Sequence, residues 1–460
     1  MYPPLQQDRS DLEQLLQDTC RYATEVLTGI DERPVTGRAT SPTRVHLPES
    51  GHGLSAALAD FQSRWAPGFS GCAGPRYLGF VTGGATPAAL AGDWLTSTFD
   101  QNPTSALDST APDLERETLS WLRALFGLSD AHEGTFVTGA TMSNMVGLAI
   151  AREWVGEQRG IQISEHGLAA LGPIRVFSGA AHASIYKSLS MLGIGRAALS
   201  ALPLLPGREA VDVQALEAAL RSCAGEAIIV VANIGTVNTV DFDDLAAIVA
   251  LKARYSFWLH ADGAFGSFAA LSPDFAHLTT GLDAADSICL DCHKWLNVPY
   301  DSAVQFTRRR DLQLRVFQNS AAYLGEAAEI PDFVHLTPEN SRRLRALATW
   351  FALAAYGRAG HRDIVERNVA AARALGAQID RHPALRLLAP VQMNVVCFTL
   401  ADSPTQARVQ AFLQRITDSG EAFLTPTLLH GTWAARAAFS NWRSTTQDIP
   451  RVFQAIQDAL

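Results

Sequence analysis

The chain has 460 residues and a net charge of -9, with 47% hydrophobic and 18% charged residues. This composition is typical of a globular protein, and the length exceeds one ordinary core, so we expect a large domain and a smaller one. The acidic balance without a long basic run disfavours nucleic acid as a partner. The longest apolar helical stretch, at about 13 residues, is too short to span a bilayer, so no membrane partner is expected.

The N-terminal segment, residues 1–75, is predicted to be helical. Its apolar face is formed by Leu12, Leu15, Leu16 and Leu27. Prolines and glycines between residues 34 and 53 mark loops. The segment is too thin to fold alone, so we expect it to pack on the large domain or on a second subunit. Its start has no basic stretch followed by an apolar one, so no secretion signal is predicted and a cytoplasmic location is expected.

Residues 76–345 are predicted to form the large domain, because short apolar runs alternate there with amphipathic stretches. Strands are predicted near residues 134–138, 174–179, 200–204, 227–233, 257–261, 286–290 and 302–307. Helices are predicted at 142–155, 183–193, 212–222 and 243–254, with Asp212 and Asp243 as N-terminal caps. This alternation predicts an α/β fold with a mostly parallel, seven-stranded sheet that helices cover on both faces.

Residues 346–460 are predicted to form a smaller α/β domain. The stretch 342–380 contains two predicted helices, which separate between Gly357 and Gly360. Shorter strands follow, together with a helix at 405–419 and a last helix at 447–459. We therefore expect an N-terminal segment and two domains.

Five candidate side chains follow directly after predicted strands: Thr138, His182, Thr236, Asp262 and Lys294. Ligands of mostly parallel sheets bind beyond the carboxyl ends of the strands, so one cleft could collect all five. A lysine and an aspartate at the ends of two successive strands can hold one pyridine ring between them. The amine forms a Schiff base with an aldehyde and the carboxylate pairs with the protonated ring nitrogen, which is the arrangement of a pyridoxal phosphate enzyme.

Ordinary structural roles remain open for each of these residues. Lys294 could be a solvated surface lysine, but its apolar neighbours would depress the pKa of its amine and favour attack on a carbonyl. Asp262 could be a turn aspartate, while Ala264 would place a small methyl against one face of the ring. His182 could stack on the opposite ring face or only cap a helix. Thr236 could donate a hydrogen bond to the ring substituents or the substrate carboxylate, or only form a turn.

The small residues from Thr138 to Asn144 lead from a predicted strand into a predicted helix. Small side chains let the backbone approach a phosphate, and a helix N-terminus presents free N–H groups and a partial positive charge. Thr141 and Ser143 could add hydroxyl donors. We therefore interpret this turn as a candidate phosphate site, although small polar turns of this kind are common.

Six cysteines are scattered along the chain, which suggests no disulfide framework and fits a reducing cytoplasm. Cys289 and Cys292 form a C-x-x-C pair that could bind a metal or be redox-active. Cys289 falls in a predicted strand, however, and no second pair is present to complete a zinc site. We interpret both as small buried apolar residues and expect no metal.

Several segments carry a resemblance to a known family. They are His293-Lys294-Trp295-Leu296-Asn297, Asp262-Gly263-Ala264, Ala181-His182-Ala183-Ser184, Gly74-Pro75-Arg76-Tyr77, residues 91–95, and Arg342-Arg343 with Ala355-Tyr356-Gly357. With them the chain resembles the group II pyridoxal phosphate decarboxylases, the family of aromatic amino acid, histidine and glutamate decarboxylases. The resemblance implies a fold type I homodimer, with the active site at the subunit interface and the N-terminal segment wrapped around the partner.

The resemblance also implies roles for individual residues. Lys294 corresponds to the Schiff-base lysine, Asp262 to the partner of the ring nitrogen, and His182 to the stacking imidazole. The phosphate contacts and the lining of the same pocket correspond to Ala140, Thr141, Asp291 and His293. The implied reaction is the decarboxylation of an L-amino acid through a quinonoid intermediate, with pyridoxal 5′-phosphate as cofactor.

One position departs from the family pattern. The family carries a tyrosine in a loop before the Arg-Arg pair, to which protonation of the quinonoid carbanion is assigned, whereas ungapped counting places Phe333 there. Phenylalanine cannot donate a proton, so the carbanion would live longer and could meet dioxygen, as in relatives that resemble aldehyde synthases. Alternatively the loop alignment is shifted, and Tyr323, His335 or a water supplies the proton in a plain decarboxylase.

The sequence does not determine the substrate side chain. Aromatic residues that could line a substrate pocket, or belong to the core, are Tyr77, Phe80, Trp94 and Phe99. Arg76 or Arg443 could pair with an acidic substrate, or both could be structural. We therefore expect an aromatic or other bulky amino acid before glutamate. An aminotransferase on the same fold, a silent cofactor-binding scaffold and a non-enzymatic binding module remain the alternatives.

Overall fold

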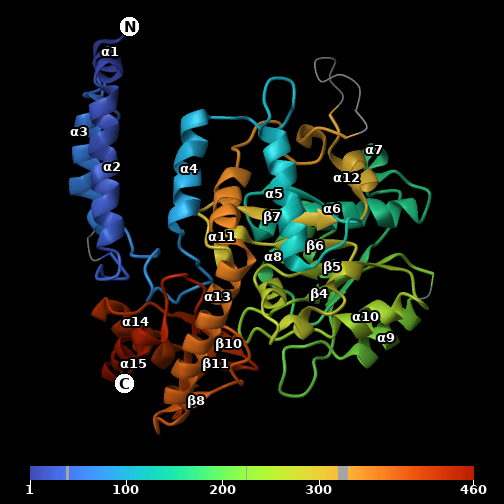
Figure 1. Cartoon of the computed structure of the whole chain (residues 1–460). Helices are drawn as coiled ribbons and strands as arrows, with labels where there is room; N and C mark the ends of the chain where they lie inside the picture. Colours follow the sequence, from blue (N-terminus) through green and yellow to red (C-terminus); the bar gives the residue numbers. More distant parts are fainter. Residues whose placement is uncertain (38–40, 224, 320–329) are drawn as a thin grey trace.

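The computed structural model describes residues 1–37, 41–223, 225–319 and 330–460. Its centre is a seven-stranded sheet with the order β1-β7-β6-β5-β4-β2-β3 (Figure 1). The strands are β1 (Glu133–Val137), β2 (Arg175–Ser178), β3 (Leu199–Ala201), β4 (Ile228–Asn233), β5 (Phe257–Asp262), β6 (Ser287–Leu290) and β7 (Ala303–Thr307). Strand β7 is antiparallel to both of its neighbours and the other neighbouring pairs are parallel. The predicted mostly parallel sheet is therefore confirmed.

Helices cover both faces of this sheet, because its buried strands present apolar side chains to two separate cores. In β4, Ile228 and Val230 belong to one core, whereas Ile229 and Val231 belong to the other. The first core is covered by α5 (Ala111–Phe126), α9 (Val213–Ser222), α10 (Leu245–Leu251) and the first half of α13 (Ala346–Asp380). The second is covered by α6 (Ala140–Glu157), α7 (Ile163–His166), α8 (Ala183–Met191) and α12 (Arg310–Phe317).

One of the two predicted helix caps is wrong. Asp212 caps α9 as expected, since its side chain accepts from the backbone N–H groups of Gln214 and Ala215. Helix α10 is instead capped by Asp244, which accepts from the N–H of Ala247. Asp243 is buried and accepts backbone N–H groups of the neighbouring segments, and burial raises the pKa of its carboxyl to about 6. Because its carboxylate is buried and engaged by these N–H groups, Asp243 does not cap α10.

A second sheet of four antiparallel strands lies near the C-terminus, in the order β10-β11-β9-β8. Its strands are β8 (Leu385–Leu387), β9 (Val395–Leu400), β10 (Thr425–Leu429) and β11 (Thr432–Ala438). Its core is shared with α14 (Gln406–Ser419), α15 (Ile449–Asp458) and the second half of α13. Helix α13 is kinked at Gly357, where φ is 54° and ψ is -168°. The expected separation falls at this glycine, although the second helical half follows directly instead of after Gly360.

The N-terminal helices α1 (Pro3–Ser10), α2 (Leu12–Thr28) and α3 (Gly53–Asp60) form an arm beside α4 (Pro87–Phe99) (Figure 1). Of the predicted apolar face, Leu15 is buried, whereas Leu12 and Leu16 are 53% and 56% exposed. This face is therefore only partly covered by the chain itself. The division into residues 1–75, 76–345 and 346–460 stays a prediction. Within the described ranges, no helix has both the length and the apolarity that crossing a membrane requires.

Candidate active site

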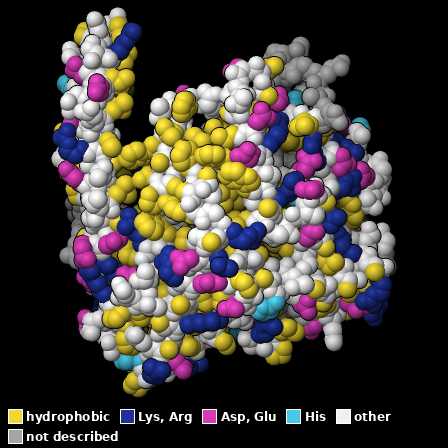
Figure 2. All heavy atoms as spheres, in the orientation of Figure 1, with side chains coloured by type: hydrophobic (Ala, Val, Ile, Leu, Met, Phe, Trp, Pro, Cys, Tyr) yellow, Lys and Arg dark blue, Asp and Glu magenta, His cyan; other side chains and the backbone are white. Residues whose placement is uncertain are grey.

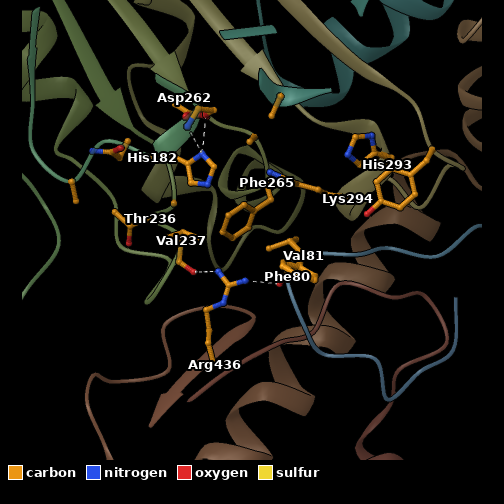
Figure 3. A pocket seen from close by; sticks show the side chains of 17 residues that line it. Phe80, Val81, His182, Thr236, Val237, Asp262, Phe265, His293, Lys294 and Arg436 are labelled. Atoms are coloured by element: carbon orange, nitrogen blue, oxygen red, sulfur yellow. Dashed lines mark hydrogen bonds between the residues drawn. The ribbon is translucent and has the colours of Figure 1, made fainter. Parts of the chain in front are cut away.

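A pocket of about 260 Å³ lies at the carboxyl ends of the central strands, where the two sheets meet (Figure 3). It collects eight of the predicted site residues: Phe80, Ala140, His182, Thr236, Asp262, Ala264, His293 and Lys294. Thr141, Asp291, Tyr77 and Phe333 are not part of its lining. The strand ends therefore bring together residues from widely separated segments, as expected for a mostly parallel sheet.

Lys294 is held on α11 (Cys292–Trp295), the short helix that follows β6. Its side chain is 19% exposed, and its Nζ lies 3.7 Å from Asp291 Oδ2 and 5.6 Å from the ring centre of Phe265. The sequence contains two other lysines, Lys187 and Lys252. Lys187 is exposed on α8 and Lys252 pairs with Asp286, so neither amine lines the pocket. Lys294 is thus the one lysine of the chain placed for covalent chemistry here.

Gly83 lets a second segment approach Lys294 closely. Its N–H donates to the carbonyl of His293 over 3.4 Å, and a Cβ at this position would lie 1.7 Å from the carbonyl oxygen of Lys294. Any side chain there would displace the lysine-bearing helix. Sequence analysis attributed no role to this glycine, because a glycine pair in a loop is a weak signal by itself.

Asp291 is 1% exposed and lies directly behind the pocket wall. Its Oδ2 accepts the N–H of Ala140, the first residue of α6, over 3.1 Å. Its Oδ1 lies 3.1 Å from His293 Nε2 but makes no hydrogen bond. Burial raises the pKa of the Asp291 carboxyl, and the nearby Lys294 and His293 partly offset this effect.

His293 is oriented by its other ring nitrogen. The N–H of Ser302 donates to His293 Nδ1 over 3.2 Å, so the neutral ring carries its proton on Nε2, the nitrogen near Asp291. The ring also packs on Tyr300, with 4.3 Å between ring centres. Burial lowers the pKa of His293, which keeps the imidazole neutral.

Asp262 ends β5 and is 7% exposed, with its carboxylate turned to the pocket (Figure 3). Asn144 Nδ2 of α6 donates to its Oδ2 over 3.1 Å. Ala264 and Phe265 follow Asp262 in sequence and line the same pocket. An anionic group, a small methyl and an aromatic ring therefore stand beside one another at this wall.

His182 caps α8 and also lines the pocket, whereas its stacking on a cofactor ring stays a prediction. Its Nδ1 accepts the N–H of Ser184 over 3.2 Å, and Ser184 Oγ lies 2.8 Å from the same nitrogen. The ring is exposed toward the pocket. Loss of water around the ring lowers the pKa of His182, while Asp262 acts in the opposite direction.

Thr236 is 4% exposed and its hydroxyl is already engaged. It donates to Glu209 Oε2 over 2.7 Å and accepts the N–H of Asp241 over 3.0 Å. Donation to a ligand, as considered from the sequence, would require Thr236 to give up the bond to Glu209. Glu209 is itself buried, and it also accepts from Thr239 and Asn238.

Arg436 is a pocket residue that sequence analysis missed. It lies on β11, is 6% exposed, and donates to the carbonyl oxygens of Val237 and Phe80 over 2.6 and 2.9 Å (Figure 3). Burial lowers the pKa of its guanidinium to about 10, so it remains a cation at neutral pH. The available signal was an arginine inside the apolar run of residues 433–439, since buried charges are rare without a function.

The two arginines considered for an acidic substrate lie elsewhere. Arg76 donates to the carbonyl oxygen of Glu421, and Arg443 packs over Trp442 and pairs with Asp31. Neither lines the pocket. Both arginines make structural contacts in this fold.

The four aromatic residues considered for the substrate pocket lie in different surroundings. Phe80 is 58% exposed and lines the pocket, whereas Tyr77 stacks on Phe423 with 4.7 Å between ring centres. Trp94 and Phe99 on α4 are 42% and 64% exposed, so they belong neither to the pocket nor to the core. Figure 2 shows a broad apolar surface in the region of α4, facing the N-terminal arm.

Phe333 begins a short 3-10 helix (Phe333–His335) and is 3% exposed. Its ring lies between the guanidinium groups of Arg116 and Arg342, 5.3 and 5.2 Å from the ring centre. His335 Nδ1 accepts the N–H of Asn319 over 3.1 Å. Tyr323 lies outside the described residues. Neither Phe333 nor His335 lines the pocket of its own chain.

Cys289 and Cys292 are buried and unpaired. Cys289 Sγ contacts the carbonyl oxygen of Ala140 at 3.6 Å. Burial raises the pKa of both thiols above their ordinary value, which disfavours the thiolate needed for metal binding or redox chemistry. Their surroundings support a packing role.

The fold and the pocket together define a fold type I pyridoxal phosphate enzyme. Residues 38–401 match the family model described as "Pyridoxal-dependent decarboxylase conserved domain". The chain therefore belongs to this family of pyridoxal phosphate-dependent amino acid decarboxylases. The residues at the pocket fit the cofactor, since they offer an amine, a carboxylate in the same pocket, and a helix N-terminus whose N-cap residue, Gly139, has no side chain to cap it.

Individual relatives agree with the family assignment. The chain is 28% identical to the aromatic-L-amino-acid decarboxylase of Bacillus atrophaeus, covering 83% of this chain and 80% of that protein. It is 23% identical to the phenylacetaldehyde synthase of a Rosa hybrid cultivar, covering 90% and 86%. The crystal structure of Oryza sativa TDC with PLP and tryptamine superposes with a TM-score of 0.90 at 21% identity, covering 98% of this chain and 97% of that chain. The last comparison shows the shared fold.

Proposed function

We propose that this enzyme decarboxylates an L-amino acid with an aromatic or other bulky side chain, and that Lys294 holds its cofactor. The observation that carries the proposal is the placement of Lys294 and Asp262 in one pocket, together with Ala264. Bound pyridoxal phosphate supplies an electron sink for the carbon–carboxylate bond that breaks. The remaining work falls to the side chains of this chain.

Each pocket side chain has a task in this proposal. Lys294 Nζ would be the attachment point of the cofactor, and as a free amine it could move protons within the pocket. Asp262 keeps a proton on the ring nitrogen, which is an electrostatic contribution to the bond-breaking step. His182 and Ala264 would border the cofactor ring, one as an imidazole and the other as a small methyl. The start of α6, at Ala140 and Thr141, would bind the phosphate, and the N–H of Ala140 would first have to leave Asp291 Oδ2.

The preference for a bulky apolar substrate rests on the pocket lining. Apolar and aromatic side chains of the lining are Phe80, Val81, Val237, Phe265 and Tyr300. Arg436 is the lining cation on the side of the second sheet, and it can position the substrate carboxylate. An amino acid with a large apolar side chain matches such a pocket better than one with a second carboxylate.

A homodimer completes the proposal. Phe80 and Tyr300 line the pocket yet are both 58% exposed, so the pocket mouth is open in a single chain. Trp94, Phe99 and, on the N-terminal arm, Leu12 and Leu16 are exposed as well. We propose that a second copy covers these surfaces, because apolar surface of this extent favours association. Light scattering of the purified protein measures the assembly directly.

A second candidate is an aldehyde synthase that couples decarboxylation to oxidative deamination. Phe333 favours it, because a phenyl ring cannot supply the proton that yields an amine. Similarity to a phenylacetaldehyde synthase supports the same direction. The two activities differ in products: the decarboxylase releases carbon dioxide and an amine, whereas the synthase consumes dioxygen and also releases ammonia, peroxide and an aldehyde.

The experiment that tests the proposal is a substrate screen of the purified, cofactor-loaded protein. The protein is supplied with each of the standard amino acids while carbon dioxide, ammonia and peroxide are recorded. Carbon dioxide without ammonia from an aromatic or bulky substrate supports the decarboxylase. Carbon dioxide with ammonia and peroxide supports the synthase. A ketoacid product without carbon dioxide would overturn both.

A further inference from the structure

Asp262 is the end of a chain of buried hydrogen bonds that begins at Trp258. Trp258 Nε1 donates to Ser287 Oγ over 2.9 Å, and Ser287 Oγ lies 2.8 Å from His260 Nδ1. His260 Nε2 lies 2.9 Å from Asn144 Oδ1, and Asn144 Nδ2 donates to Asp262 Oδ2 over 3.1 Å. The four residues behind Asp262 are at most 1% exposed, so water does not compete for these bonds.

The two ends of this chain fix the direction of each bond within it. An indole N–H can only donate, and an ionised carboxylate can only accept. Trp258 donates to Ser287 Oγ, whose own proton remains available to His260 Nδ1. Burial lowers the pKa of His260 to about 4, so the ring is neutral and donates through one nitrogen only. Because Asn144 Nδ2 donates to Asp262, Asn144 Oδ1 must accept. His260 therefore accepts the Ser287 hydroxyl at Nδ1 and carries its own proton on Nε2. That proton goes to Asn144 Oδ1, which turns the amide nitrogen of Asn144 toward Asp262.

A branch from Asn144 reaches the other side of the pocket. Asn144 Nδ2 also donates to Ser184 Oγ over 3.0 Å. The hydroxyl proton of Ser184 is therefore free to point to His182 Nδ1, 2.8 Å away, which also accepts the N–H of Ser184. With two donors on Nδ1, the neutral ring of His182 must carry its proton on Nε2.

We propose that Asn144 is a positioning residue that sets two pocket groups at once. One of its N–H groups orients the carboxylate of Asp262 and stabilises it as an anion, and the other fixes the tautomer of His182 through Ser184. His260, Ser287 and Trp258 keep the Asn144 amide in this orientation. The inference rests on the proposed function, in which Asp262 pairs with the ring nitrogen of the cofactor.

Loss of the bond from His260 would have a specific consequence. The Asn144 amide could then rotate by half a turn and present Oδ1 to the Asp262 carboxylate, so that two acceptors would face each other. Asp262 would take up a proton or turn away, and the ring nitrogen would lose its anionic partner. The chemical step would be slowed while the pocket itself kept its shape.

A structural role for the same residues predicts a different order of effects. If they only fill the core, the largest buried side chain, Trp258, should matter most. If the hydrogen bonds act on Asp262, the effect should fall along the chain, from Asn144 to His260, Ser287 and Trp258. The order of the effects therefore separates the two roles.

The test compares Asn144→Leu, His260→Leu, Ser287→Ala and Trp258→Phe in the full-length protein loaded with cofactor that is ¹⁵N-labelled at the ring nitrogen. The measurements are the ¹⁵N shift of that atom, and kcat and KM for the substrate found in the screen. For Asn144→Leu we expect the shift to move toward that of an unprotonated ring, with a kcat loss of about 100-fold and little change in KM. Trp258→Phe should be closest to the parent protein.

Two further variants serve as controls. His260→Gln keeps an N–H donor and should restore most of the parent ¹⁵N shift. Thr307→Val removes a buried hydroxyl directly across the β6–β7 ladder from Ser287, but outside the hydrogen-bond chain, and should leave the shift unchanged. If Asn144→Leu does not fold, His260→Leu carries the same test.

Two results would overturn the inference: a parent-like ¹⁵N shift in both the Asn144 and the His260 variants, or a larger change in Trp258→Phe than in Asn144→Leu. Asp262→Asn distinguishes this failure from failure of the proposed function. If Asp262→Asn changes the shift and the Asn144 variant does not, only the inference is wrong. If Asp262→Asn changes nothing either, the pairing of Asp262 with the ring nitrogen is wrong as well.

Discussion

Asp262 and Asp291 are two buried aspartates at the ends of neighbouring strands, β5 and β6, yet their surroundings differ. Asp262 faces the pocket and receives an amide N–H from Asn144. Asp291 lies behind the wall, receives the first N–H of α6, and stands beside Lys294. A strand end therefore supplies only the position of a side chain. In the proposed function, the different donors around the two carboxylates would assign Asp262 to the cofactor ring and Asp291 to the phosphate end of the pocket.

Replacing Asp262 should produce the larger effect of the two. Asp262→Asn keeps the shape of the side chain but removes the anion that, in the proposed function, would hold the ring nitrogen protonated. We expect kcat to fall by about 100- to 1,000-fold, the usual cost of removing a preorganised electrostatic contact. Cofactor affinity should change much less, because Lys294 and the phosphate site remain. Steady-state kinetics and a cofactor titration measure both quantities, and an equal loss in both would remove the distinction between the two aspartates.

Replacing Asp291 should instead change the pH dependence of cofactor binding. Burial raises the pKa of the Asp291 carboxyl, so the folded protein binds this proton more tightly than the unfolded chain does. Its contribution to stability is therefore fully present below the unfolded pKa and is lost as pH rises through the raised folded pKa. At pH values above the folded pKa, the ionised carboxylate of Asp291 would also repel the phosphate of the cofactor. The Asp291→Asn variant removes this repulsion.

For Asp291→Asn we expect tighter binding of pyridoxine 5′-phosphate than in the parent protein, by about tenfold at pH 8, because the parent carboxylate repels the phosphate. This ligand has no aldehyde, so imine formation with Lys294 does not contribute. The advantage should shrink toward low pH, where the parent carboxyl is neutral. Asp301→Asn is the matched control, because it removes an acid close by that pairs with Arg345 instead of α6. Weaker binding by Asp291→Asn at every pH would show that the carboxylate itself is required.

The smallest effect is expected outside the pocket, at Phe333. If Phe333 occupies the place of the family's loop tyrosine, Phe333→Tyr should shift the products toward amine, because a phenol can donate the missing proton. The ratio of amine to aldehyde measures the shift. Phe333→Leu is the control, since it removes the ring without adding a donor. An unchanged ratio in the tyrosine variant would show that the loop placement is wrong.

Much of the fold could be predicted from the sequence, because apolar runs bounded by helix signals mark buried parallel strands. The same pattern placed His182, Asp262 and Lys294 beyond strand ends, and the pocket contains all three. The sequence predicts Asp243 as a helix cap, because an aspartate before an apolar run has that signature. The adjacent Asp244 has it too, and only the packed structure shows which of the two is buried.

Other parts of the site could not be predicted, because they depend on contacts between distant segments. Arg436 reaches the pocket from the second sheet, and Gly83 approaches Lys294 from a loop more than 200 residues earlier. Asn144 and His260 have no motif of their own. Their role follows from the order of donors and acceptors between Trp258 and Asp262, which no spacing along the chain reveals.

The most direct test of the central claim is to locate the covalent link to the cofactor. The loaded protein is reduced with borohydride, digested, and examined by mass spectrometry for a phosphopyridoxyl group on each of the chain's three lysines. We predict the group on Lys294 in the parent protein and in Lys187→Ala, and none in Lys294→Ala. A modified Lys187 or Lys252 with an unmodified Lys294 would contradict the account.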